Sequence, residues 1–524
     1  MKSRAETVPG GVEGLIAIVT TWHDSSVVLV AQSSPKENPV PSPSSKVTKT
    51  AVVPAWVGGA VQDLRQLVLQ PQVTGLDGRR IRAVVQATSP PFPGASLSDR
   101  PEYPRRVKLA QQVNQPDPED ARRTIESVAR ASYGRLVAFL SARTRDVAAA
   151  EDALGEALVA ALTAWPRDGI PDSPEAWLLT AARRRLVDRA RHDRVRAESV
   201  PTLELIAGAS GEVVAAGPIP DECLQLLFVC AHPAIDPDVH TPLMLQTVLG
   251  LDAAAIARAF LVSAAAMAQR LVRAKAKIRD AGIAFELPEA RELPERLEAV
   301  LNAIYAAYAS GWEDAAGTDP RARSLAEEAI WLARVLKERL PEEPEVRGLL
   351  ALMLQCEARR PARRGADGRF VPLSEQEPRL WIASMIEEAE GELAAAAATA
   401  TARLGRFQIE AAIQSVHAER ARSGRTDWSA IAWFYQRLVE LAPTVGARVG
   451  RAAAVAEVQG AAAGLSLLDE IEDRSIGGYQ PYWAVRGHLL QTLGRSRDAA
   501  EAFDHAIGLA EDDAVRRFLV ERRG

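Results

Sequence analysis

Residues 151–165 read Glu-Asp-Ala-Leu-Gly-Glu-Ala-Leu-Val-Ala-Ala-Leu-Thr-Ala-Trp, and this stretch decides the fold class. Its large apolar side chains recur at the spacing of one helix face, which predicts a stripe turned toward a core. The stripe consists of Leu154, Leu158, Ala161, Leu162 and Trp165. Three carboxylates lie off it, on Glu151, Asp152 and Glu156, so the predicted helix has an acidic face.

The next helix is strongly basic. After a loop at 166–173 it is predicted to begin at Pro174, with Trp177, Leu178, Ala182 and Leu186 turned inward. Its arginines are Arg183, Arg184, Arg185, Arg189, Arg191, Arg194 and Arg196, opposed only by Asp188 and Asp193. Such a run is either a solvated face or a surface for a polyanion, because crowded guanidinium groups repel one another unless an anion shares their field.

Residues 238–281 predict three short helices. Asp252 is placed to cap the second helix, 253–260, and Ser263 to cap the third. The third turns Met267, Leu271, Ala274 and Ile278 inward and carries Arg270, Arg273, Lys275, Lys277 and Arg279. Two helices joined by a tight turn, the second of them basic, are the layout of a helix-turn-helix.

Together these stretches resemble sigma factors of the sigma-70 family, of the extracytoplasmic-function (ECF) type. Residues 151–158, 165–171 and 174–189 resemble region 2, and residues 256–279 resemble region 4, in the family's order. The resemblance implies a non-enzymatic subunit whose partners are bacterial core RNA polymerase and promoter DNA. By position, it assigns the polymerase contact to Glu151, Asp152 and Glu156.

The resemblance also implies the DNA contacts. It assigns the −10 promoter element to Arg184, Arg185, Asp188 and Arg189, and the −35 element to Gln269, Arg270, Arg273, Lys275 and Lys277. Gln269 and Arg270 suit base edges, since Gln pairs with adenine and Arg with guanine, which leaves the other three for phosphates. Two positions depart from the family: Gly155 stands where Gln is usual, and Arg184 where Asn is usual.

The C-terminal half predicts further helical pairs. The residues Trp483, Gly487, Leu490, Gly494, Ala499, Phe503 and Ala506 match a tetratricopeptide (TPR) repeat. Steps of 34 residues upstream give two degenerate repeats, so a plain bundle of α-hairpins stays an alternative. Residues 297–363 resemble the middle domain of an ECF subgroup that ends in such repeats. A second basic cluster of Arg359, Arg360, Arg363 and Arg364 fits a surface loop as well as a ligand site.

An all-α chain with six segments is therefore expected. Residues 1–118 are Pro/Ser-rich without periodicity, which predicts disorder or a spurious extension that activity does not need. The other segments are region 2 (119–196), a linker (197–219), region 4 (220–282), a helical middle domain (286–390) and TPR-like repeats (391–524) that would bind a protein or peptide.

Composition limits the partners, cofactors and cellular location that the chain can have. A net charge of −5 leaves room only for local basic surfaces, and three cysteines suggest a reducing compartment. Cys223, Cys230 and His232 would need a fourth ligand to bind zinc, so we expect buried cysteines, no metal and no cofactor. No apolar run, signal peptide or catalytic motif is found, which predicts a cytoplasmic protein without a membrane partner. The alternative is a helix-turn-helix regulator with a TPR-like sensor that does not bind polymerase.

Overall fold

The computed structural model describes residues 118–194, 220–260, 262–313, 320–399, 404–472 and 474–524. Across these residues the chain is helical and forms no β-strand, so the all-α prediction is confirmed. The predicted extension up to residue 117 and the predicted linker at 197–219 lie outside the described residues. None of the described helices is long and apolar enough to cross a bilayer.

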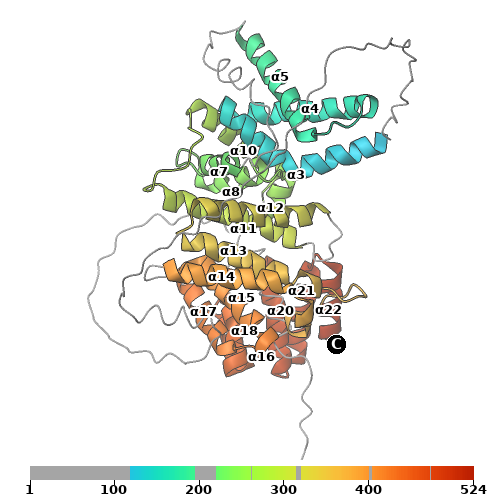
Figure 1. Cartoon of the computed structure of the whole chain (residues 1–524). Coiled ribbons are helices and arrows are strands. Elements are labelled where there is room, and N and C mark those ends of the chain that lie inside the picture. The colour runs from blue at the N-terminus through green and yellow to red at the C-terminus, as the bar shows by residue number, and fades with distance from the viewer. Residues whose placement is uncertain (1–117, 195–219, 261, 314–319, 400–403, 473) are drawn as a thin grey trace, which may run out of the picture.

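The N-terminal helices follow one another in layers (Figure 1). The first layer holds α3 (Pro118–Thr144), α4 (Val147–Asp168) and α5 (Pro174–Arg194). The second holds α7 (Pro220–Cys230), α8 (Pro237–Thr247), α9 (Ala253–Ala259) and α10 (Ala264–Asp280). The pair α11 (Leu293–Glu313) and α12 (Pro320–Arg339) comes next, and α11 packs on α7 and α8. One continuous apolar core joins these helices to part of the C-terminal half.

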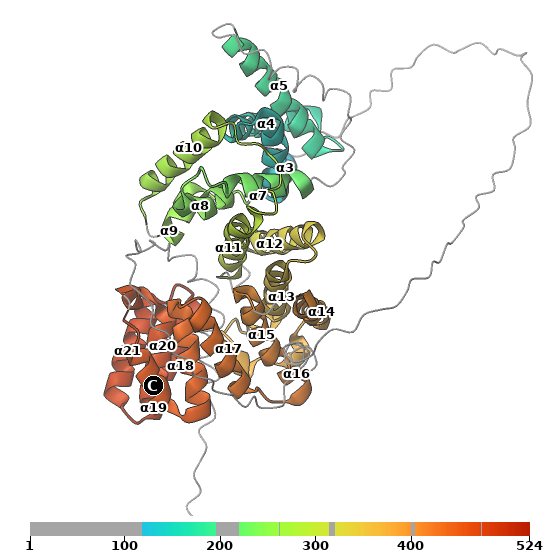
Figure 2. The ribbon, with the colours of Figure 1, turned by 90° about the vertical axis from the view of Figure 1, so that its left-hand side faces the viewer.

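The C-terminal half is built from consecutive helices that pack in pairs (Figure 2). They are α13 (Pro344–Ala358), α14 (Ala383–Thr399), α15 (Arg406–Ala418), α16 (Arg420–Ser423), α17 (Trp428–Leu441), α18 (Val445–Gln459), α19 (Ala461–Asp469), α20 (Gln480–Thr492), α21 (Ser496–Leu509) and α22 (Asp513–Arg523). In the pair α20 and α21, Gly487 lies against the ring of the fully buried Phe503, where a Cβ would come within 3.0 Å. Gly494 makes the turn between them with a φ of +75°.

Helix α4 buries a face richer in alanine than the sequence stripe predicted. Leu154, Ala161 and Trp165 are buried as expected, together with Ala150, Ala153 and Ala157. Leu162 was expected in the core and is 49% exposed, so that prediction was wrong. The small alanine side chains let neighbouring helices approach this face closely, and the buried face is therefore rotated away from Leu162.

The predicted helix-turn-helix caps are confirmed. The carboxylate of Asp252 accepts a hydrogen bond from the backbone N–H of Ala255 at 2.7 Å. The hydroxyl of Ser263 accepts one from the N–H of Ala266 at 3.2 Å and so caps α10. The four predicted inward residues of α10 are all buried. Local capping and burial therefore fix the helix that carries the basic side chains.

The second basic cluster is not a solvated surface loop. Arg359 and Arg363 are 3% and 5% exposed, and burial lowers the pKa of Arg363 to about 10. Arg364 forms an ion pair with Asp512, just before α22, and the ring of Phe370 packs edge-to-face on Phe518 of α22. The segment after α13 therefore ties the middle helices to the last helix of the chain.

Helices α13 and α15 meet at backbone distance. A Cβ on Gly348 would lie 2.7 Å from the backbone nitrogen of Gln408, closer than real Cβ contacts come. The carboxylate of Glu345 accepts hydrogen bonds from the N–H groups of Phe407 and Gln408, both at 3.0 Å. Burial raises the pKa of Glu345, and these two N–H groups act against that rise.

Replacing Gly348→Ala is expected to lower the free energy of unfolding. The added methyl overpacks a backbone contact, at a cost of about 1–3 kcal/mol. Ala is better than Gly in a helix interior by only about 1 kcal/mol, which offsets part of the cost. Gly391→Ala in α14 is the matched control, because no atom lies within 4 Å of its added Cβ. Denaturant unfolding of both variants checks this, and equal stability of the two would contradict it.

Candidate functional site

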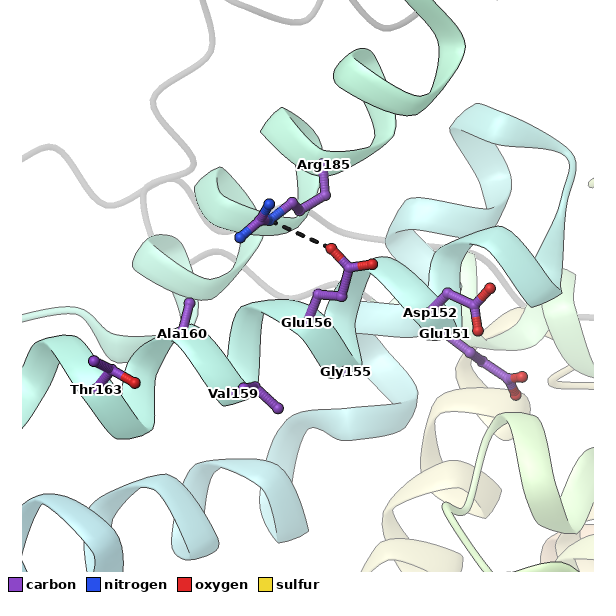
Figure 3. A pocket seen from close by; sticks show the side chains of 8 residues that line it. All are labelled: Glu151, Asp152, Gly155, Glu156, Val159, Ala160, Thr163 and Arg185. Carbon is purple, nitrogen blue, oxygen red and sulfur yellow. Dashed lines mark ion pairs between the residues drawn. The ribbon is translucent and has the colours of Figure 1, made fainter. Parts of the chain in front are cut away.

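The acidic helix and the basic helix lie side by side and pair through their charged residues. Arg189 of α5 donates to Asp152 of α4 at 3.0 Å, and Arg185 lies 3.4 Å from Glu156. An open groove runs along this face of α4 (Figure 3). Its lining consists of Glu151, Asp152, Gly155, Glu156, Val159, Ala160, Thr163 and Arg185. The predicted acidic and basic surfaces thus meet at one groove.

Both ion pairs of the groove are exposed to water. The side chains of Asp152, Glu156, Arg185 and Arg189 are between 55% and 61% exposed. Exposed pairs of this kind contribute about 0–1 kcal/mol, since solvent screens them and ordering the side chains costs entropy. These four groups can therefore leave one another for an external partner at little cost.

Two apolar side chains on the outer side of α4 were missed as site residues. Val159 is 64% exposed and Leu162 is 49% exposed. Val159 lines the groove with the carboxylates. An apolar patch beside acidic groups is typical of a protein-binding surface. The sequence could have indicated Val159, because it is an apolar residue outside the predicted stripe. It could not have indicated Leu162, which the stripe itself included.

Glu151 differs from the other two carboxylates because it points into the protein. Its carboxylate forms an ion pair with Lys275 of α10 at 2.5 Å, and the two side chains are 15% and 9% exposed. Burial raises the pKa of Glu151, and the nearby Lys275 ammonium acts against that rise. Glu151 was expected to face polymerase and Lys275 to face phosphate, and in this arrangement neither side chain is open to either partner.

The remaining predicted DNA contacts are exposed on two separate helices. On α5, Arg184, Arg185, Asp188 and Arg189 are exposed, whereas the guanidinium of Arg183 lies 4.9 Å from the ring centroid of Phe139. The side chains beyond Arg191 on α5, and Arg196, lie outside the described residues. On α10 the exposed face carries Gln269, Arg270, Arg273 and Lys277.

The cysteines beside α8 are structural in this fold. Cys223 and Cys230 are both buried, and the sulfur of Cys230 lies 3.5 Å from the hydroxyl of Thr247. Burial raises the pKa of the Cys230 thiol to about 12, so the thiol stays protonated at neutral pH. In the part of the chain that the structure describes, no three His, Cys, Asp or Glu residues gather as a metal site.

Comparison with known proteins places this geometry in a class. The family described as "Sigma-70 region 2" matches residues 128–196, which carry α4 and α5. A "Family of unknown function (DUF6596)" matches residues 296–397, which begin in α11. Uncharacterized protein R00370 of Rhizobium meliloti (strain 1021) is 40% identical over 381 residues, covering 72% of this chain and 89% of that protein. No solved structure matches the chain.

A region 2 match on this helix pair defines a transcription initiation factor that binds RNA polymerase and recognises promoter DNA. Residues 128–196 thus carry a sigma-70 region 2 domain, and this match supports a factor of the sigma-70 family. The chain shares most of its length with the uncharacterized Rhizobium protein, including the middle helices.

Reversing the charge of Asp152→Lys together with Glu156→Lys is expected to lower the affinity for core polymerase at least tenfold. Two exposed pairs contribute only about 0–1 kcal/mol each, so the fold should persist. The matched control is Asp498→Lys with Glu501→Lys, two exposed and paired carboxylates of α21. Binding assays with purified core polymerase, with thermal unfolding beside them, check this. Equal loss of binding in the control would show that net charge alone is responsible.

Proposed function

We propose that the chain is an ECF-type sigma factor that contacts polymerase through the groove of α4 and reads two promoter elements through α5 and α10. One observation carries the proposal. The same chain has an acidic groove with exposed apolar side chains on α4 and exposed basic faces on α5 and α10. The groove suits a protein with basic side chains around an apolar patch. The basic faces suit nucleic acid.

The −10 element is assigned to α5. Arg184 is exposed on α5, so its guanidinium is open to a phosphate or a base edge. Arg185 and Arg189 are held beside the groove by Glu156 and Asp152. If polymerase side chains form ion pairs with these carboxylates instead, both guanidinium groups become available to DNA. Polymerase binding and DNA binding are then coupled through weak, exchangeable ion pairs.

The decisive test is transcription in vitro. Purified full-length chain with core polymerase should give run-off transcripts from a cognate promoter, selected from genomic fragments bound by the holoenzyme. Binding of the chain to DNA without any polymerase-dependent transcript would favour the helix-turn-helix regulator instead. The acidic groove supports the sigma reading, since a simple repressor has no use for it.

The middle and C-terminal helices are proposed to modulate this activity in cis and to receive the signal. The guanidinium of Arg296 on α11 is buried, donates to the backbone carbonyl of Phe228 on α7, and lies 6.0 Å from the Phe228 ring centroid. The guanidinium of Arg135 on α3 lies 5.9 Å from the ring centroid of Trp331 on α12. One helix pair therefore touches both DNA-reading units, and its movement would change their relative position.

The helices from α17 to α22 are proposed to be TPR-like and to bind a protein or peptide. Antiparallel pairs with a glycine against an aromatic ring support this, at Gly487 with Phe503 and at Gly450 with Tyr435. Stacked pairs present long surfaces suited to extended partners. The tethered partner-binding half would act on regions 2 and 4 at high effective concentration.

Arg270→Ala is expected to change the sequence specificity of DNA binding, whereas Lys277→Ala is expected to change its overall affinity. If Arg270 reads a guanine, its loss costs about 1–3 kcal/mol at one −35 position and relaxes specificity there. Lys277 lies two turns further along the same exposed face, so its loss should weaken binding to every sequence and lessen the salt dependence. Affinities of holoenzyme for a panel of −35 variants at several salt concentrations measure both. Identical effects of the two variants on all sequences would contradict the assignment.

Truncation after Ala284 is expected to change promoter output several-fold. This truncation removes α11, which shares the core of α7 and α8. Trp331→Ala in the full chain is therefore a gentler second variant, since it removes the ring that Arg135 faces. Run-off transcription measures both. Unchanged output and unchanged signal response in both variants would exclude modulation in cis.

A further inference from the structure

Two basic side chains meet inside the protein where the end of α13 packs against α15 (Figure 2). Arg359 directly follows the last residue of α13 and is 3% exposed. His417, near the end of α15, is also 3% exposed. The Arg359 guanidinium donates to the side-chain oxygen of Gln414, one turn before His417 on the same helix. A buried cation and a buried imidazole are thus neighbours.

The groups around these two side chains do not satisfy them fully. The Arg359 guanidinium bonds to the Gln414 amide and lies 3.6 Å from the Cys356 sulfur, and neither partner is a carboxylate. Its atom Nη1, and Nε2 of His417, are buried and meet no hydrogen-bond partner in the part of the chain that the structure describes. A guanidinium stays charged at neutral pH, and a buried charge is costly without a counter-charge. The end of the α13 dipole supplies only about half a negative charge.

The surroundings of His417 are positively charged. Burial first, and then the nearby guanidinium groups of Arg359 and Arg420, lower the pKa of His417 to about 3, so its ring is neutral at physiological pH. No carboxylate of the described residues is among the groups that act on it. Cys356, which touches Arg359, also acts on the charge of Arg363, a further buried guanidinium. Water could accept hydrogen bonds at this place, but only an anion also offsets the charge.

We propose that a phosphate-type oxyanion, free or as the end group of a larger molecule, binds between the end of α13 and α15. Its oxygens accept hydrogen bonds from Nη1 of Arg359 and from Nε2–H of His417, which a neutral imidazole donates in one tautomer. A phosphate group carries about −1.5 to −2 charges and has three strong acceptor oxygens, which suits donors from two helices. The inference goes beyond the proposed sigma function and does not depend on it.

The segment after Arg359 connects this site to the end of the chain. It returns to α13 at Ile382, whose N–H donates to the carbonyl of Ala358 at 2.9 Å. Arg420 of α16 donates to three backbone carbonyls of the same segment. Within it, Glu375 pairs with Arg522 of α22 at 3.1 Å. An anion held by Arg359 would therefore bind at the point where α13, α15 and the segment that contacts α22 meet.

Arg359→Gln in the full chain tests the site through the sign of its effect. The variant removes the charge and keeps an amide that can donate to Gln414. After exhaustive dialysis into chloride buffer it should be at least as stable to heat as wild type, because replacing an uncompensated buried charge is neutral or stabilising. Inorganic phosphate at matched ionic strength should raise the thermal midpoint of wild type and leave that of the variant unchanged. Equilibrium dialysis with labelled phosphate should show at least tenfold weaker binding by the variant.

The matched control is Arg369→Gln, which removes the same charge from a side chain that is 63% exposed in the same segment. It should bind phosphate like wild type. His417→Phe is a second test variant, because it removes Nε2 and keeps a ring against Trp428, whose centroid lies 5.4 Å from that of His417. It should weaken phosphate binding at least fivefold without loss of stability in chloride, and it carries the test if Arg359→Gln does not fold.

Three outcomes would overturn the proposal. The first is that wild type binds neither inorganic phosphate nor glycerol phosphate, and the second is equal phosphate affinity in wild type and both test variants. The third is that Arg359→Gln loses the same stability with and without phosphate, since the protein alone would then satisfy the charge. Binding of glycerol phosphate without binding of free phosphate would support the site and identify a larger phosphomonoester as its ligand.

Discussion

The contact between Gly134 and the Val248 carbonyl is the constraint on which the arrangement of this molecule depends. It fixes the distance between the first two helical layers and leaves no room for a side chain. With that distance fixed, Glu151 and Lys275 are brought together and excluded from water. The middle helices then reach both layers at once. Arg296 of α11 donates to the Phe228 carbonyl on α7, and the ring of Trp331 on α12 faces Arg135 of α3. The absence of a side chain at Gly134 therefore allows the close packing that buries Glu151 and Lys275, while other charged residues stay exposed to partners.

Burial divides the charged residues of α4 into two kinds. Asp152 and Glu156 are exposed and pair with arginines that solvent can replace. Glu151 is turned inward by one helical step and pairs with Lys275, whose side chain is almost fully buried. Because a helix turns by about 100° per residue, neighbouring carboxylates on one helix can serve an external partner and an internal contact at once. The difference follows from position on the helix and not from residue type.

Much of the fold could be predicted from the sequence, because its signals are local. The caps at Asp252 and Ser263 and the buried face of α10 depend on spacing within a few residues, and they were predicted correctly. Leu162 was misplaced because alanine is a weak marker of burial, so the alanine face of α4 was not recognised. The burial of Lys275, Arg359 and Arg363 could not be foreseen either. Their partners lie far away in the sequence or in a segment whose path no periodic pattern reports.

The balance between ion-pair attraction and loss of hydration explains why the candidate site is built from weak contacts. A sigma subunit must leave one set of contacts to form another, so strong internal pairs on its binding surface would oppose both polymerase and DNA. The exposed pairs of the groove contribute little to stability. The buried pair of Glu151 and Lys275 has a carboxylate oxygen without a hydrogen bond, so it regains hydration when it opens. The groove and the Glu151–Lys275 pair are thus both built from contacts that can be exchanged, whereas Gly348 of α13 packs at backbone distance on α15. If the C-terminal helices modulate activity in cis, as proposed, these exchangeable contacts are the ones that a signal would change.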